Sequence, residues 1–174
     1  MKPWEWLRAK ITGSLWKMEA YEERQWYGID HRMAAMGILV NTRSANERAN
    51  IVAFTGNPTA PDDRYLVNAQ VGELDVVASE PGVTPEKVLL DVSTGDGTDI
   101  IRIAYSSETN GQWVLSDEQL RALGQTLAEI EANYPIDGDP PNDATVLFDT
   151  EWKVLSDGRL VIKQVRPFLR HTTF

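Results

Sequence analysis

The chain has 174 residues, a formal net charge of −9 and no cysteine. Its length suits one domain with a substantial core, and its 42% hydrophobic and 25% charged residues are ordinary for a soluble globular protein. The acidic balance argues against nucleic-acid and anionic-membrane partners, which need basic patches, and the lack of cysteine excludes disulfides, thiolate zinc sites and cysteine nucleophiles.

We expect no signal peptide at the N-terminus, because residues 1–6 contain no long apolar run. No stretch reaches the roughly 18 uninterrupted apolar residues of a membrane-spanning helix. We therefore expect a soluble, cytoplasmic protein without a membrane partner. Only two histidines occur, His31 and His171, so a histidine-rich metal site is excluded.

The first predicted element covers residues 3–27 and is one helix or a broken pair of helices. Gly13 and Ser14 are candidates to interrupt it, and Gly28 is placed to cap its C-terminal end. The apolar residues recur at three- and four-residue spacing, the pattern of a helix with one buried face. They are Trp4, Leu7, Ile11, Leu15 and Met18.

Several strand-like runs follow this helical segment. The first is nearly all apolar, so we expect a strand that is buried on both faces. The last two are expected to pair as a hairpin, because a Gly-rich turn at 93–98 separates them. The predicted strands are residues 35–40, 50–55, 64–71, 87–92 and 100–105.

A second helix begins after Ser116, which can cap it together with Gln119 in a capping box, and runs to about Asn133. After a polar loop at 137–142, residues 144–154 and 159–165 form a predicted closing hairpin. This element order predicts an α+β fold with a mostly antiparallel sheet, an N-terminal helix and one further helix. We expect a single domain over 1–174, with a helical segment at 3–27 and a sheet-containing lobe at 34–167.

The closing hairpin carries the polar side chains with the clearest chemical meaning. Side chains alternate along a strand, so Gln164 and Arg166 point the same way, and Glu151 faces both if the hairpin closes. A carboxylate, an amide oxygen and a guanidinium on one face can hold a metal ion and a phosphate chain. A set of satisfied polar groups on an exposed sheet face explains the same residues, and the residues alone favour it.

Five short motifs stand in a fixed order along the chain. They are Ser14-Leu15-Trp16 with Ala20-Tyr21-x-x-Arg24, Gly28-Ile29-Asp30-His31-Arg32, Val52-Ala53-Phe54-Thr55-Gly56-Asn57-Pro58, Leu66-Val67-Asn68-Ala69-Gln70, and Asp149-x-Glu151-Trp152 with Gln164-Val165-Arg166-Pro167. In this order they resemble the nucleotide-binding domain of phosphoenolpyruvate synthase and pyruvate phosphate dikinase, which rifampin phosphotransferases share. The resemblance covers residues 14–167.

The resemblance implies an ATP-grasp fold, which holds a nucleotide between two lobes, and this chain resembles the second lobe. The implied cofactors are ATP and Mg²⁺. The family's closing hairpin assigns Glu151 and Gln164 to Mg²⁺ and Arg166 to the transferring phosphate, as the catalytic residue. These roles suit phosphoryl transfer, which depends mainly on positioning and charge neutralisation.

Two further nucleotide contacts follow from the same resemblance. The family's Phe-Thr-x-Asn-Pro segment lies near the phosphates, which assigns Thr55 a phosphate contact, although Thr55 can equally cap the turn that follows it. The strand end at Leu39, Val40 and Asn41 matches the hinge against which adenine lies.

The family's first lobe supplies a phosphate-binding lysine and arginine that have no counterpart in this sequence. We therefore expect an ATP·Mg²⁺-binding lobe of a kinase-like or dikinase-like transferase that is inactive as an isolated chain. Either the chain is a fragment of a larger protein, or it has a partner, which is a first lobe on another chain or a second copy bound through the Trp-rich N-terminal helix. The alternative is a non-catalytic binding or interaction module that keeps the fold.

Three other features have simpler explanations than a functional site. Residues 93–98 lack the lysine and the following helix of a P-loop, so a hairpin turn is expected. Asp137, Asp139 and Asp143 lack the glycine and glutamate spacing of an EF-hand and indicate a solvated acidic loop. His31 has no evident catalytic partner and is expected to be structural.

Overall fold

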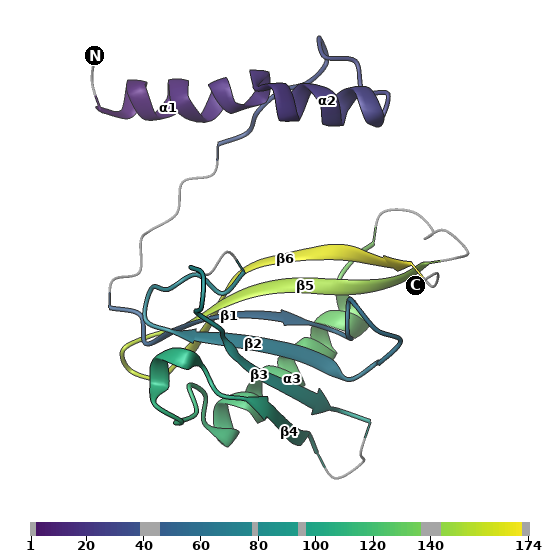
Figure 1. Cartoon of the computed structure of the whole chain (residues 1–174). Helices are drawn as coiled ribbons and strands as arrows, with labels where there is room; N and C mark the ends of the chain where they lie inside the picture. Colours follow the sequence, from purple (N-terminus) through teal and green to yellow (C-terminus); the bar gives the residue numbers. More distant parts are fainter. Residues whose placement is uncertain (1–2, 39–45, 78–79, 94–96, 137–143, 172–174) are drawn as a thin grey trace. The chain divides into compact units, whose positions relative to one another are not determined.

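The computed structural model of the chain describes residues 3–38, 46–77, 80–93, 97–136 and 144–171 (Figure 1). Their contacts separate the chain into two units, Met1–Arg43 and Ser44–Phe174. The acidic loop expected at 137–142 and the adenine hinge expected at 39–41 lie outside the described residues.

The first unit is a broken pair of helices, as the sequence predicts. Helix α1 spans Pro3–Gly13, a 3₁₀ turn spans Ser14–Trp16, and helix α2 spans Met18–Trp26. The break lies at Lys17, whose extended backbone (φ −69°, ψ 156°) cannot continue a helix. Gly28 follows α2 with φ of 65°, the left-handed conformation in which glycine ends helices.

His31 has the structural role that its isolation in the sequence suggests. Its Nδ1 accepts a hydrogen bond from Arg24 Nε at 3.0 Å, and its ring stacks on Tyr21 with centroids 4.2 Å apart. These contacts fix the chain that leaves α2.

The strand predicted for residues 35–40 is wrong for residues 35–38, which are exposed and belong to no strand. An apolar run becomes a strand only when a neighbouring strand pairs with it, and composition alone does not supply one.

The second unit contains a six-stranded antiparallel sheet in the order β4-β3-β2-β1-β5-β6 (Figure 1). This confirms the α+β prediction, the hairpin of β3 with β4 and the closing hairpin of β5 with β6. The strands are β1 (Ala49–Phe54), β2 (Tyr65–Val71), β3 (Glu86–Asp91), β4 (Asp99–Ala104), β5 (Ala144–Val154) and β6 (Leu160–His171).

Helix α3 (Asp117–Asn133) covers one face of this sheet, and a short 3₁₀ turn (Ser107–Thr109) precedes it in the chain (Figure 1). The predicted capping box is present: the Ser116 hydroxyl accepts from the Gln119 amide at 3.2 Å, and the Gln119 side chain accepts from the Ser116 amide at 3.0 Å. These bonds satisfy amide groups that the first turn of a helix leaves unpaired.

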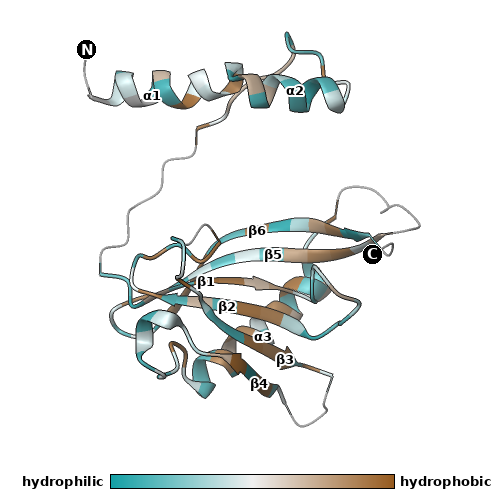
Figure 2. Ribbon diagram, viewed as in Figure 1, coloured by the Kyte–Doolittle hydropathy of each residue, from teal (hydrophilic) through white to brown (hydrophobic). Residues whose placement is uncertain are grey.

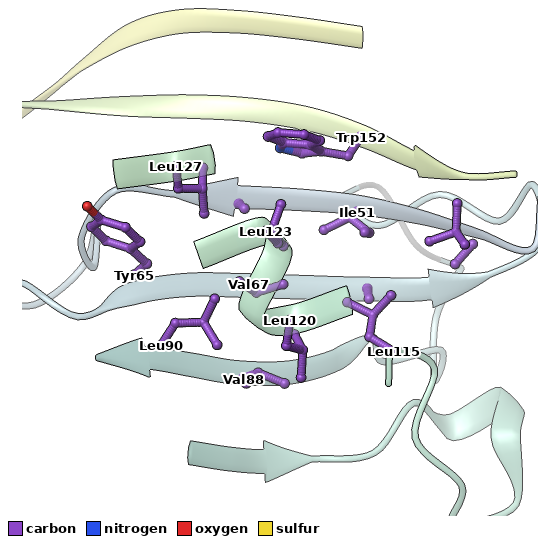
Figure 3. Close-up of a cluster of buried hydrophobic side chains, with 14 residues drawn as sticks. Ile51, Tyr65, Val67, Val88, Leu90, Leu115, Leu120, Leu123, Leu127 and Trp152 are labelled. Carbon is purple, nitrogen blue, oxygen red and sulfur yellow. The ribbon is translucent and has the colours of Figure 1, made fainter. Parts of the chain in front are cut away.

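The hydrophobic core lies between α3 and the sheet. Figure 2 shows hydrophobic residues gathered along β1, β2 and β3, and Figure 3 shows the α3 leucines among them. Burying side chains of this size stabilises the fold by about 1.5–3 kcal/mol each relative to exposure. The fully buried side chains of the cluster include Leu120, Leu123 and Leu127 of α3 and Ile51, Val67, Val88 and Leu90 of the strands.

The opposite face of the sheet is called here the second face. Since side chains alternate and Ile51 and Ala53 point to the core, Asn50 and Val52 of β1 lie on the second face. The register then assigns Asp149, Glu151 and Lys153 of β5 to the same face, because they are paired with Phe54, Val52 and Asn50. This register determines which polar residues of the closing hairpin meet.

Candidate functional site

The central feature of the second face is the pair formed by Glu151 and Gln164. These residues are directly opposite each other in the register of β5 and β6. Opposite residues in an antiparallel pair have their Cβ atoms about 4.5–5.5 Å apart. The turn that sets this register contains Gly158, whose φ of 88° suits glycine, and it closes through the Leu155 amide bonded to the Arg159 carbonyl at 2.9 Å.

A β-bulge lies immediately beside this pair. Glu151 is opposite Gln164, but Trp152 is opposite Ile162, so Lys163 is the extra residue on β6. A bulge redirects the side chain of its extra residue. Lys163 Nζ accordingly lies 3.0 Å from Glu151 Oε2, with the two side chains 42% and 40% exposed.

The guanidinium of Arg166 is held in a fixed orientation by Asp149. The two residues are opposite each other in the register. Arg166 donates from Nε and Nη2 to Asp149 Oδ2, at 2.8 Å and 2.6 Å. The Asp149 side chain is 9% exposed, whereas that of Arg166 is 62% exposed. One end of the guanidinium is therefore anchored in the protein, and the side chain remains accessible to an anion.

A pocket of about 460 Å³ is lined by Glu151, Lys163 and Arg166, whereas Gln164 and Asp149 are not among its lining residues. Residues 73–77, which follow β2 and include the carboxylates Glu73 and Asp75, also line it. Asn50 ties this segment to the second face, because its side-chain amide donates to the carbonyls of Gly72 at 3.1 Å and Leu74 at 3.4 Å. The sequence-predicted Glu151 and Arg166 thus line one concave surface.

Thr55 lies at the other end of β1 and is only 2% exposed. Its hydroxyl accepts a hydrogen bond from the Phe148 amide at 2.9 Å, and its own amide donates to the Phe148 carbonyl at 3.1 Å. These bonds continue the β1–β5 ladder beyond Phe54. The Thr55 hydroxyl thus bonds across to β5 rather than to the following turn that the sequence suggested it caps, and its phosphate contact stays a prediction.

Sequence reasoning missed two residues of this site, Asp149 and Lys163. Alternation along β5 places Asp149 on the same face as Glu151, so period-two spacing was a usable signal for it. Lys163 gave no such signal, because a regular strand would direct it away from Gln164. Only the bulge brings it to Glu151.

The side-chain oxygens of Glu151 and Gln164 suit a magnesium ion that binds together with a phosphate chain. Mg²⁺ prefers oxygen ligands and is usually held by one or two carboxylates together with substrate phosphates and water. The residues described in the structure contain no group of three or more His, Asp or Glu side chains placed to hold a metal alone. The donor set therefore suits Mg²⁺ bound to a nucleotide better than a metal bound by the protein only.

Residues 8–173 match the family model described as the pyruvate phosphate dikinase AMP/ATP-binding domain. The chain belongs to this family. The match covers nearly the whole sequence and confirms the resemblance carried by the five motifs. No curated protein and no solved structure gave a match to the chain.

The pocket lies in a domain that belongs to the pyruvate phosphate dikinase nucleotide-binding family. The closing hairpin, which carries Glu151, Gln164 and Arg166, lies within the matched residues. Among the helices of the described residues, none is long and apolar enough to span a membrane.

Proposed function

We propose that the chain is an ATP·Mg²⁺-binding lobe of a phosphotransferase similar to pyruvate phosphate dikinase and phosphoenolpyruvate synthase, with the architecture of the second ATP-grasp lobe. The observation that supports this most is the grouping of Glu151, Gln164 and Arg166 on one sheet face in a chain that belongs to the nucleotide-binding family. The antiparallel sheet, covered by α3 on one face, presents its other face to the nucleotide.

In this proposal Glu151 and Gln164 hold Mg²⁺, and Arg166 binds the phosphate that is transferred. When bound, Mg²⁺ supplies neutralisation of the negative charge on the phosphate oxygens. Arginine suits its role because its planar fork matches phosphate geometry and stays charged. Asp149 positions the fork, which lowers the entropy lost when phosphate binds.

Catalysis requires a second protein surface that covers Glu151 and Arg166. The exposed fractions of Glu151 and Arg166, 40% and 62%, leave both groups in contact with water. Preorganised charges stabilise a transition state most strongly in a site from which water is excluded. We infer that a first lobe closes over the second face and that phosphoryl transfer depends on this closure.

Calorimetric titration of ATP with Mg²⁺ tests the proposal. We expect binding by the wild type and at least about tenfold weaker binding by Glu151→Ala/Arg166→Ala, since hydrogen bonds to charged groups contribute about 1.5–3 kcal/mol each. The matched control is Asp157→Ala/Arg159→Ala, which removes an exposed Asp–Arg pair from the turn of the same hairpin.

Each outcome of this titration has a defined meaning. Wild type that does not bind ATP at millimolar concentration contradicts nucleotide binding by this chain. Binding that the Glu151→Ala/Arg166→Ala variant leaves unchanged contradicts the site assignment. Equal losses in this variant and in the hairpin-turn control would assign the effect to the hairpin as a whole.

The second candidate function is an interaction module without catalysis. It is favoured by the aromatic side chains of the first unit, where Trp16 is 65% and Trp26 is 85% exposed. Exposed aromatic residues are enriched at protein interfaces. Light scattering over a range of concentrations, read together with the ATP titration, separates the two candidates, because self-association without ATP binding supports the interaction module only.

A further inference from the structure

We propose that Lys163 is an exchangeable cation of the nucleotide site, which neutralises Glu151 in the empty protein and transfers to the phosphate chain when nucleotide and divalent cation bind. This inference rests on the proposed function, because it adds a further residue to the same pocket and couples the binding of the metal to the binding of the nucleotide. It concerns a side chain that reaches the site through the β-bulge.

The bulge is the first support for this role. In a regular β6 strand, Lys163 would point to the face opposite Gln164, since neighbouring residues alternate. The extra residue instead directs the ammonium to Glu151, 3.0 Å from Oε2, and Lys163 lines the pocket together with Arg166. A positive charge is thereby placed beside the carboxylate proposed to bind Mg²⁺.

The second support is the difference between the two cations of the pocket. Arg166 is held by two hydrogen bonds to Asp149, whose side chain is 9% exposed, so its orientation is fixed. Among the described residues, Lys163 forms one ion pair, with the 40% exposed carboxylate of Glu151. Exposed pairs of this kind contribute little free energy, so breaking one in favour of another anion costs little. Arg166 is therefore a fixed phosphate ligand, and Lys163 is a mobile one.

Competition for Glu151 follows directly from this geometry. A divalent cation that binds Glu151 in the empty pocket must displace the ammonium, which is then left beside a dication. A phosphate chain that enters with the metal gives the ammonium a new anionic partner. Lys163 therefore weakens binding of the metal alone and strengthens binding of the nucleotide, so the two ligands bind cooperatively through it. By thermodynamic linkage, each increases the affinity of the other by the same factor.

The test compares wild type with Lys163→Met, which keeps most of the side-chain length and removes the charge. The control is Lys87→Met, the same change at an exposed lysine on the second face of β3. β3 lies four strand positions from β6, about 19 Å at ordinary strand spacing. Three affinities are measured for each protein: Mn²⁺ alone by water-proton relaxation, ATP alone with EDTA by calorimetry, and ATP in the presence of Mg²⁺.

For Lys163→Met we expect Mn²⁺ alone to bind about two- to fivefold more tightly, as expected for the loss of one competing exposed ion pair. We expect ATP without metal to bind nearly as in the wild type, because Lys163 is then still paired with Glu151, and ATP with Mg²⁺ to bind about tenfold more weakly, because one charged phosphate contact is lost. The cooperativity between metal and nucleotide should fall accordingly. Lys87→Met should match the wild type in all three measurements.

Three outcomes would contradict this inference, and they can be told apart. Wild type that binds no ATP under any of these conditions overturns the proposed function and this inference with it. Wild type that binds ATP·Mg²⁺, combined with Lys163→Met affinities equal to those of wild type, overturns the role of Lys163 and leaves the proposed function standing. Equal losses in Lys163→Met and Lys87→Met would also overturn it, because the effect would then be one of net charge.

Discussion

Arg166 and Asp149 are cross-strand partners on the second face, and the guanidinium donates twice to a single carboxylate oxygen, at 2.8 Å and 2.6 Å. Asp149 is the buried member of the pair and Arg166 the exposed one. Removal of the arginine leaves a largely buried carboxylate without this partner. Removal of the carboxylate charge leaves the arginine in place but free to reorient.

The first prediction uses this asymmetry. Arg166→Met should lower the free energy of unfolding by about 1–3 kcal/mol, because the Asp149 carboxylate loses its charged donor. Asp149→Asn/Arg166→Met should recover part of this loss, since an amide is less costly to bury than a carboxylate. Urea denaturation of the two variants measures the effect. A double variant less stable than Arg166→Met would contradict the interpretation.

A second prediction concerns Gly124, which lies in the middle of α3. Alanine is favoured over glycine within a helix by about 1 kcal/mol. A Cβ at this position, however, would lie 2.9 Å from Thr98 Oγ1 and 3.0 Å from Thr98 Cγ2. Thr98 is itself only 5% exposed. We therefore expect Gly124→Ala to destabilise the protein by about 1–2 kcal/mol despite its better helix propensity.

The matched test for Gly124 is a double-mutant cycle. Thr98→Ala removes both atoms that the new methyl group would contact, so Gly124→Ala should be neutral or stabilising in that background. Thermal or urea denaturation of the four proteins gives the interaction energy. An unchanged cost of Gly124→Ala in the Thr98→Ala background would show that crowding by Thr98 is not its cause.

The parts of the fold that the sequence predicted correctly depend on local signals. Ser116 and Gln119 form a capping box because both partners lie within one helical turn, and Asp157-Gly158 closes the last hairpin because glycine accepts the required backbone conformation. The shared face of Gln164 and Arg166 follows from alternation alone. In contrast, the apolar run at 35–38 carries no local signal that tells whether a partner strand exists.

The parts of the site that the sequence did not predict depend on a break in local regularity. The period-two rule that groups Glu151, Gln164 and Arg166 also directs Lys163 to the other face, so the rule gives the wrong answer at this one residue. A bulge is a property of two paired strands, and a single strand does not reveal where the extra residue falls. The orientation of Arg166 likewise depends on Asp149 from the neighbouring strand.

A third prediction follows from Glu86, a fully buried carboxylate on β3. Burial raises the pKa of Glu86, although hydrogen bonding from the Val114 amide and the nearby Arg102 guanidinium oppose the shift. A raised folded-state pKa means that the folded protein binds the proton more tightly than the unfolded chain. This contribution to stability is complete below the unfolded pKa of about 4.3 and is lost as the pH rises through the folded pKa.

Glu86→Gln should therefore stabilise the protein relative to wild type more at pH 7 than at pH 4. Glutamine cannot ionise, and its side-chain oxygen can still accept from the Val114 amide. The measurement is the free energy of unfolding in urea at several pH values, with the exposed Glu118→Gln on α3 as the control. A difference between Glu86→Gln and wild type that does not change with pH would contradict the prediction.

The last prediction concerns Arg170, which anchors the loop that follows Thr55. Its Nη1 lies 3.3 Å from the Asn57 carbonyl, 3.3 Å from the Ala60 carbonyl and 3.2 Å from the Asp62 carbonyl. Its Nη2 donates to Asp63 Oδ1 at 2.9 Å, and the residue is 8% exposed. One guanidinium thus satisfies several carbonyl groups of the loop at 57–63, which no apolar side chain can do.

Arg170→Met should lower the free energy of unfolding by about 2 kcal/mol, because loop carbonyls lose their donor. The loss of stability should also be greatest in the loop at 57–63. The Asn57 amide, which donates to the Asp62 carbonyl at 2.7 Å, should exchange with solvent faster than the reduced global stability explains. Arg159→Met serves as the control, because that side chain is 72% exposed. If exchange at Asn57 rose only as much as global unfolding requires, Arg170 would stabilise the sheet as a whole rather than this loop.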